Sequence, residues 1–195
     1  MAKIILASGS PRRKEIFDSL GFDYKVVVPS IDESSVQGET PSELVARLSA
    51  EKAADAVAKI GGKLPVVASD TVVQYGDRIL GKPKNPKEAF DMLRLLSGCG
   101  HTVHTGLTVA FAGDVLTETV STHVYFRELS DREILFYVES GEPMDKAGSY
   151  GIQSLASVFV KRIDGDYFAV VGLPVCRMTE MLSSFGINTE DLRRD

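Results

Sequence analysis

The stretch from Ile4 to Arg13 constrains the fold more than any other part of the chain. Ile4-Ile5-Leu6 predicts a short buried strand that ends at small residues. Ser10 and Pro11 then predict a helix start, with Ser10 as N-cap and Pro11 at the first helical position, where its missing N–H costs nothing. Such a strand–turn–helix presents backbone N–H groups at the positive end of a helix, and Gly9 lets a ligand come close. The turn of this stretch is therefore suited to bind an anion.

Arg12 and Arg13 add two positive charges to the first turn of this helix. The helix macrodipole disfavours cations at that end, so a purely structural purpose explains them poorly. A bound anion such as a phosphate chain would account for both arginines. The alternative is a capped helix with two solvated arginines, and this stretch alone does not decide between the two interpretations.

The 195 residues carry a net charge of −5. The length suits one domain over residues 1–195, built as two joined lobes without a separable linker. An acidic chain lacks the basic surface that general nucleic-acid or anionic-membrane binding needs, so neither partner is expected and any positive site must be local. Cys99 and Cys176 are too few for a disulfide framework or a zinc cluster. With no secretory signal pattern and no apolar run of about 18 residues, we expect a cytoplasmic protein.

Helices and strands alternate early in the chain, and long hairpins dominate later. We expect helices that end near residues 20, 59, 96, 138 and 185. We expect strands over 24–28, 66–75 with an interruption at 69–71, 78–80, 101–112 and 115–125, and a last hairpin that pairs 158–163 with 167–171. This order predicts an α/β fold with a mixed sheet and helices packed on it, rather than a regular doubly wound sheet.

Two charged residues stand where apolar residues are expected. Asp70 lies between Val66-Val67-Ala68 and Val72-Val73, and a buried carboxylate is costly unless it is paired, metal-bound or reactive. We therefore take Asp70 as the strongest functional candidate. Lys52 falls inside the apolar stripe of the second helix, where it either extends outward to water or points its ammonium into a polar cleft. Lys82 can reach the same site from the far strand of the 66–80 hairpin.

The charged candidates together suit the hydrolysis of a phosphoanhydride. They are Arg12, Arg13, Lys52, Lys82, Glu33 and Asp70. The cations and a divalent metal would neutralise a phosphate chain, and a carboxylate would hold the metal or activate the attacking water. The chain has no P-loop, dinucleotide fingerprint, nucleophile elbow or catalytic Cys with an evident His partner, which disfavours kinase-type transfer and covalent catalysis.

Two further polar stretches have different interpretations. Residues 141–153 are dense in charge and glycine, which is more typical of a functional loop than of a decorative one. His101, Thr102 and His104 lie on an expected strand without the spacing of a metal site, and we interpret them as structural.

Five motifs in register resemble the Maf family of nucleotide pyrophosphatases. The matches come in family order and cover essentially the whole chain. They are Leu6-Ala7-Ser8-Gly9-Ser10-Pro11-Arg12-Arg13, Ala68-Ser69-Asp70-Thr71-Val72-Val73, Gly81-Lys82-Pro83, Asp145-Lys146-Ala147-Gly148-Ser149-Tyr150-Gly151-Ile152-Gln153 and Val171-Gly172-Leu173-Pro174. Each motif is weak by itself, and the five in order are specific.

The resemblance implies the fold of the inosine triphosphate pyrophosphatases, in which two lobes flank a cleft on a long twisted mixed sheet. It implies hydrolysis of a nucleoside triphosphate between the α and β phosphates with Mg²⁺ or Mn²⁺, and a homodimer. The catalytic aspartate of the family falls on Asp70, and its other polar site positions fall on Ser8, Ser10, Arg13, Glu33, Lys52 and Lys82. Whether Asp70 acts as base or metal ligand, and whether Glu33 ligates metal or positions water, stays open.

Within the family, Arg12, Thr71 and Gln153 resemble the subgroup that acts on dTTP and UTP. The Gln153 amide offers both a donor and an acceptor, which matches the O4/N3–H edge of uracil or thymine. Modified pyrimidine triphosphates are an alternative substrate class. A nucleotide-binding regulator of cell division or septum formation with little catalysis is an alternative function, which the intact Asp70, Lys52 and Lys82 disfavour.

Overall fold

The computed structural model describes residues 3–194. Its strands form a seven-stranded mixed sheet in the order β2 (Tyr24–Val26), β1 (Ile4–Ala7), β3 (Val66–Tyr75), β5 (Gly100–Phe111), β6 (Asp114–Phe126) and β7 (Val160–Asp164), and β4 (Arg78–Leu80) pairs with β3. The chain divides into two compact units. Unit 1 comprises the residues up to 70, 105–120 and those from 172 onward, and unit 2 comprises 71–104 and 121–171. Three strands contribute residues to both units: β3 (Val66–Tyr75), β5 (Gly100–Phe111) and β6 (Asp114–Phe126).

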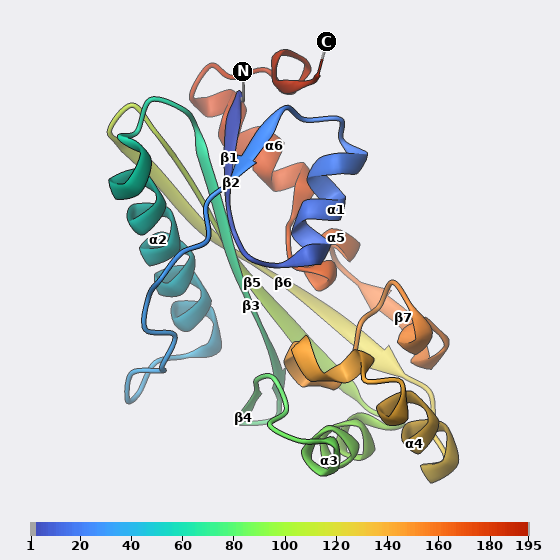
Figure 1. Cartoon of the computed structure of the whole chain (residues 1–195). Coiled ribbons are helices and arrows are strands. Elements are labelled where there is room, and N and C mark those ends of the chain that lie inside the picture. Colours follow the sequence, from blue (N-terminus) through green and yellow to red (C-terminus); the bar gives the residue numbers. More distant parts are fainter. Residues whose placement is uncertain (1–2, 195) are drawn as a thin grey trace. The chain divides into compact units, whose positions relative to one another are not determined.

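Unit 1 is built on parallel strands. β1 (Ile4–Ala7) pairs with β2 (Tyr24–Val26) on one side and with β3 on the other. In Figure 1, α2 (Pro41–Ile60) lies on one side of these strands, and α1 (Pro11–Ser19) and α6 (Val175–Ser184) lie on the other. A short 3₁₀ helix, Thr189–Leu192, follows α6. The sheet of unit 1 is therefore covered by helices on both faces.

Alternation along the strands decides which residues meet α2. Successive side chains of a strand point to opposite faces, and a buried cluster joins Ile5 and Ala7 of β1 to Ala53 and Ala56 of α2. Val66 and Ala68 of β3 belong to the same cluster. Small side chains at these positions let α2 approach the strands closely, so the next residue of β3 on this face must also lie near α2.

The start of α2 is fixed by its own sequence. The Thr40 hydroxyl accepts a hydrogen bond from the Glu43 N–H at 3.3 Å, and the Glu43 carboxylate accepts one from the Thr40 N–H at 2.9 Å. This capping box, with Pro41 at the first position, satisfies donors that a helix end leaves without partners. The predicted helix from residue 41 to about 59 is confirmed.

Unit 2 contains β4 (Arg78–Leu80), β7 (Val160–Asp164), and the helices α3 (Pro86–Leu96), α4 (Asp131–Glu139) and α5 (Tyr167–Val171). Three 3₁₀ helices, Glu142–Asp145, Ala147–Ser149 and Leu155–Phe159, lie in the segment between α4 and β7. α3 packs against α4 and against the second of these turns. His101, Thr102 and His104 hydrogen-bond to Tyr150, His123 and Ser121, respectively, as the structural interpretation predicts.

Three sequence predictions need correction. β3 continues without interruption through residues 69–71, and β2 ends at Val26 rather than at residue 28. The last hairpin is wrong: residues 167–171 form the helix α5, and β7 pairs with β6 instead. The Asp166 carboxylate accepts hydrogen bonds from the N–H groups of Phe168 and Ala169, and such capping starts a helical turn.

No helix among residues 3–194 is both long enough and apolar enough to cross a membrane.

Gly106 is a close-packing position, and its replacement tests the contact between β5 and α2. A Cβ at Gly106 would lie 2.0 Å from the Val45 carbonyl oxygen and 2.9 Å from the Ala46 nitrogen, so backbone would have to move. We expect Gly106→Ala to lower the free energy of unfolding by about 2 kcal/mol or more, measured by urea denaturation. Gly81→Ala is the control, because a Cβ there meets nothing within 4 Å. Equal stability of both variants would contradict the packing.

The stability of the fold should fall in acid through His101. Burial lowers the pKa of His101 from 6.5 to about 4, so below pH 6.5 the unfolded chain takes up a proton that the folded chain rejects. Stability is therefore complete above pH 6.5 and is lost as the pH falls toward 4, by about 3 kcal/mol at pH 4. His101→Gln should flatten this dependence in urea denaturation series. An equally steep loss of stability in His101→Gln would contradict this assignment.

Candidate active site

Asp70 lies on the α2 face of β3. Val66, Ala68 and Asp70 alternate along the strand, and the first two belong to the cluster under α2. Lys52 of α2 meets Asp70 there, with Nζ 2.6 Å from Oδ1. The side chains of Lys52 and Asp70 are only 9% and 12% exposed. The two charged residues that the sequence places among apolar ones, Asp70 and Lys52, therefore form one buried ion pair.

A second carboxylate reaches the same ammonium. Glu33 comes from the segment between β2 and α2, and its Oε1 lies 2.6 Å from the Lys52 Nζ. Its side chain is 54% exposed, in contrast to that of Asp70. Lys52 therefore joins a buried carboxylate on the sheet to a solvent-facing carboxylate on a loop.

Arg13 of α1 hydrogen-bonds to the turn after β1 and to a backbone carbonyl far away in the sequence. Arg13 Nε donates to the Gly172 carbonyl at 2.8 Å, and Nη1 donates to Ser8 Oγ at 3.3 Å. The Ser10 N–H also donates to Ser8 Oγ, at 3.1 Å. Ser10 is the N-cap residue of α1, as predicted, yet its side chain makes no capping hydrogen bond. The small hydroxyl of Ser8 thus organises the turn in place of Ser10.

The charges of unit 1 act on one another at this site. Burial lowers the pKa of Arg13 to about 10, and the charge of Asp70 opposes that shift, as does the charge of Glu33 more weakly. Arg13 remains a cation at neutral pH because its pKa is still well above 7. Arg12 lies close enough for its charge to lower the pKa of Arg13 further. We call Ser8, Arg13, Glu33, Lys52 and Asp70 the unit 1 cluster.

The donor set of the unit 1 cluster fits a magnesium-type ion. Glu33 and Asp70 each place an oxygen 2.6 Å from the same Lys52 nitrogen, so the two carboxylates converge on one cationic position. Mg²⁺ is typically held by one or two carboxylates, with water and substrate phosphates completing its shell. Within residues 3–194, no group of three or more His, Cys, Asp or Glu is arranged to hold a metal ion. A metal here would therefore depend on phosphate oxygens for part of its coordination.

The remaining predicted site residues lie in unit 2. Thr71 follows Asp70 on β3 and is half-buried, and Lys82 follows β4 and is exposed. The Gly81 carbonyl beside Lys82 accepts a hydrogen bond from the Gly148 N–H at 3.1 Å. Gly148 has φ +66°, and a Cβ there would lie 2.8 Å from Val73, so this position requires glycine. The motifs 81–83 and 145–153, distant in sequence, are thereby joined.

Gln153 is exposed, and buried groups contact the backbone just before it. The Tyr137 hydroxyl accepts from the Gly151 N–H at 3.2 Å and donates to Glu142 at 3.0 Å. Lys146, 9% exposed, donates to the Glu142 carbonyl at 2.6 Å, and its side chain packs against Gly151. The backbone just before Gln153 is therefore fixed, while its amide faces solvent.

Two residues of the site, Ser69 and Gly172, were not identified as site residues from the sequence. The Gly172 carbonyl accepts from Arg13 and, at 2.7 Å, from the Ser69 hydroxyl, so a backbone group of the motif 171–174 ties the β1 turn to β3. A backbone carbonyl is present in every residue, so the sequence does not indicate which carbonyl acts as an acceptor in the site.

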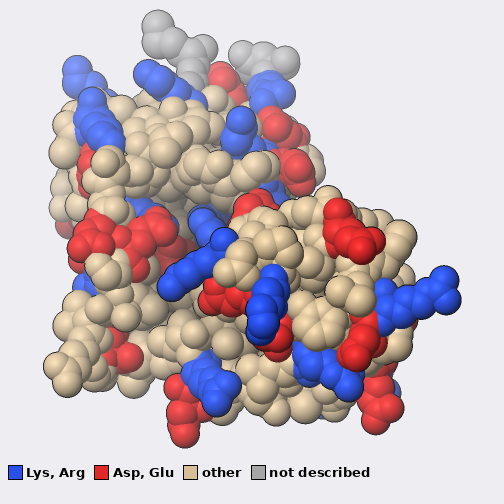
Figure 2. All heavy atoms as spheres, turned by 60° about the horizontal axis from the view of Figure 1, so that its bottom comes forward, with Lys and Arg blue, Asp and Glu red and all other residues tan. Residues whose placement is uncertain are grey.

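Charge on the visible surface is mixed. Figure 2 shows Lys and Arg lying among Asp and Glu on the face drawn, without one continuous basic area. This agrees with a net charge of −5 and with a positive site that is local.

Comparisons with known proteins agree with the five motifs. The family model described as Maf-like protein matches residues 3–185. A protein of Bacillus thuringiensis subsp. konkukian (strain 97-27) named dTTP/UTP pyrophosphatase is 47% identical over 188 residues, which are 96% of this chain and 98% of that one. A Bacillus cereus (strain AH820) protein of the same name has the same identity and coverage. Among solved structures, the Staphylococcus aureus Ham1 protein is 16% identical with a TM-score of 0.44, covering 93% of this chain and 98% of that one. The chain belongs to the Maf family.

Proposed function

We propose that this protein hydrolyses dTTP and UTP to the nucleoside monophosphate and pyrophosphate. The observation that carries the proposal is the convergence of Asp70, Glu33 and Lys52, together with the half-buried Arg13, in a chain of the Maf family. The names of relatives that are 47% identical over 96% of the chain support the choice of dTTP and UTP.

The cations bind and orient the triphosphate. Arg13 and Lys52 neutralise phosphate oxygens, and the turn at Ser8 and Ser10 supplies neutral donors. The family resemblance implies that Lys82 also binds the substrate. Arg13 is suited to a phosphate because its planar guanidinium offers several donors in a fixed arrangement. When Lys52 turns to a phosphate, Asp70 and Glu33 are released from it. The substrate thus exposes the carboxylates that the reaction requires.

Asp70 activates the attacking water. The water oxygen attacks the α-phosphorus, the bond from that phosphorus to the bridging oxygen breaks, and pyrophosphate leaves with the bond electrons. Asp70 takes the proton of the attacking water, and its buried position on β3 restricts the movement of its carboxylate. A Mg²⁺ or Mn²⁺ ion held by Glu33 and Asp70 would supply charge neutralisation on the phosphate chain.

Arg12, Thr71 and Gln153 select the base. The amide of Gln153 donates to O4 and accepts from N3–H of uracil or thymine. This recognition does not use the 5-position, so 5-modified uridine triphosphates fit the same contacts. We also propose that the enzyme works as a homodimer, as the family resemblance implies.

Asp70→Asn tests the catalytic assignment. The substitution removes the negative charge and the proton acceptor while keeping the shape, so we expect kcat for dTTP and UTP to fall by about 100-fold or more. Pyrophosphate release is measured with Mg²⁺ or Mn²⁺ and repeated with chelator, which should stop turnover. Asp91→Asn, which breaks an exposed ion pair with Lys87, is the control. Tight triphosphate binding by the unmodified protein without any product would instead favour the regulator.

Gln153→Glu tests the base selection. An ionised glutamate only accepts hydrogen bonds, so it leaves O4 of the pyrimidine without its donor. We expect the ratio of kcat/KM for UTP to that for GTP to fall by about tenfold. Because the ratio comes from one variant, a general loss of activity cancels. An unchanged ratio would remove Gln153 from the specificity assignment.

A further inference from the structure

A row of charged residues on α2 carries the segment that contains Glu33. Arg47, Glu51, Asp55 and Lys59 follow one another at a spacing of four, so they lie along one side of the helix. Arg47 pairs with Glu51 at 3.2 Å, and Lys59 pairs with Asp55 at 2.6 Å. The segment from residue 28 to 39 contains no strand or helix and is held by this row. We call it the Glu33 loop.

The beginning of the Glu33 loop is attached near the end of α2. Lys59 Nζ donates to the Val28 carbonyl at 3.1 Å, and the Ser30 N–H donates to the Asp55 carboxylate at 3.1 Å. Both contacts are to backbone, so they fix the course of the chain rather than one side chain. Glu33 follows three residues after the second contact.

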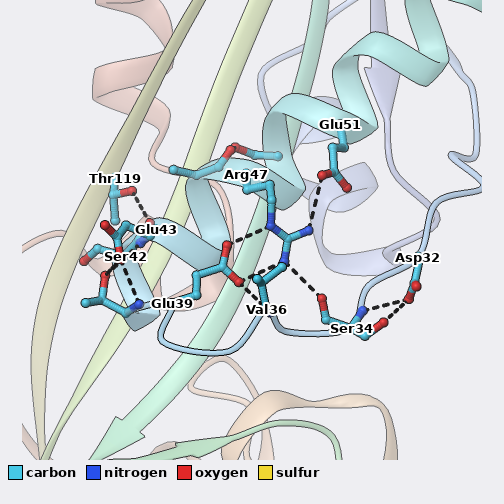
Figure 3. A network of polar contacts seen from close by, with 12 residues as sticks. Asp32, Ser34, Val36, Glu39, Ser42, Glu43, Arg47, Glu51 and Thr119 are labelled. Atoms are coloured by element: carbon cyan, nitrogen blue, oxygen red, sulfur yellow. Dashed lines mark hydrogen bonds and ion pairs between the residues drawn. The ribbon is translucent and has the colours of Figure 1, made fainter.

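The rest of the Glu33 loop is attached to Arg47, as Figure 3 shows. Arg47 Nε and Nη2 donate to the two carboxylate oxygens of Glu39 at 2.7 and 2.9 Å, and Nη2 also donates to the Ser34 carbonyl at 3.0 Å. Glu39, with a side chain only 9% exposed, accepts in turn from the Val36 N–H at 3.1 Å. With the Nη1 contact to Glu51, each of the three guanidinium nitrogens has a partner.

Glu33 therefore sits between two attached points of the loop, Ser30 and Ser34. Ordering the backbone of several residues costs more free energy than one exposed ion pair returns. The half-exposed Glu33–Lys52 contact cannot order such a loop alone. The contacts of Arg47 and of Asp55 with Lys59 supply that order before Glu33 is engaged.

We propose that Arg47 is a positioning residue that holds the Glu33 loop so that Glu33 faces Lys52 and Asp70. The proposal rests on the proposed function, since it gives Glu33 a use in the reaction. Arg47 touches Ser34, the neighbour of Glu33, and acts through the backbone rather than on substrate. Lysine would not replace it, because one ammonium cannot form the two-pronged contact with Glu39 and also reach Ser34 and Glu51.

A double-mutant cycle tests whether Arg47 acts through Glu33. We expect Arg47→Met to lower kcat/KM for UTP by about tenfold, the loss typical when a group supporting a site residue is removed. In an enzyme already carrying Glu33→Gln, the same change should cost little. Additive losses would overturn the proposal. The kcat/KM of Arg47→Lys should lie between that of the unmodified enzyme and that of Arg47→Met. This variant keeps the test valid if Arg47→Met folds poorly.

Arg177→Met is the matched control. Arg177 of α6 also lies in unit 1 and pairs with two carboxylates, those of Glu118 and Glu180, but it does not contact the Glu33 loop. We expect it to leave kcat/KM within about twofold of the unmodified enzyme. A tenfold loss in this variant as well would show that any broken ion pair of unit 1 slows the enzyme, and would overturn a specific role for Arg47.

Cleavage by a glutamate-specific protease measures the loop without any turnover. The loop contains Glu33 and Glu39, and cleavage there requires the local chain to leave its place. Arg47→Met should be cut at these sites about tenfold faster than the unmodified protein, and Arg177→Met should not. Equal cleavage in an active enzyme would overturn the Arg47 proposal alone. Faster cleavage in a protein that releases no pyrophosphate would overturn the proposed function and leave the loop attachment standing.

Discussion

The buried ammonium of Lys52 is the group on which the site depends. A charge that is only 9% exposed must be paired, and Lys52 is paired twice, to Asp70 and to Glu33. These contacts bring α2, β3 and the segment before α2 to one point. Removing either partner would leave a poorly compensated charge, so the arrangement is stable only with all three groups present. Because Lys52 needs anionic partners, a phosphate chain can compete with Asp70 and Glu33 for its ammonium, and substrate binding can then change the arrangement.

Small residues and helix ends make this pairing possible. α2 approaches the strands over Ala53, Ala56 and Ala68, and the backbone of α2 at Val45 and Ala46 packs closely on Gly106. Larger side chains would move α2 outward and take Lys52 away from Asp70. The close packing of unit 1 is thus a condition of its electrostatics. In unit 2, buried hydrogen bonds fix a different element, the backbone that precedes Gln153, through Tyr137.

Much of the site was predictable because its residues break local patterns. An aspartate inside an apolar strand and a lysine inside an apolar helical stripe are visible in sequence, and burial of both is confirmed. The helix starts at residues 41, 86 and 131 were also predictable, since capping residues and prolines act within four positions. The hairpin after β7 was predicted wrongly because Asp166 caps a helical turn there, which outweighs the strand propensity of residues 167–171.

The sequence alone determined most of the elements, the capping of the helices that begin at residues 41, 86 and 131, and the family, because those depend on neighbours along the chain and on motifs in a fixed order. It also identified most candidate site residues, by type and by position in a pattern. Only the tertiary structure decided which groups meet: that Asp70 and Glu33 share one lysine, that Ser8 rather than Ser10 organises the turn, and that the Gly172 carbonyl holds Arg13. The reason is physical. These contacts join residues up to 159 positions apart, and a backbone carbonyl carries no mark in the sequence.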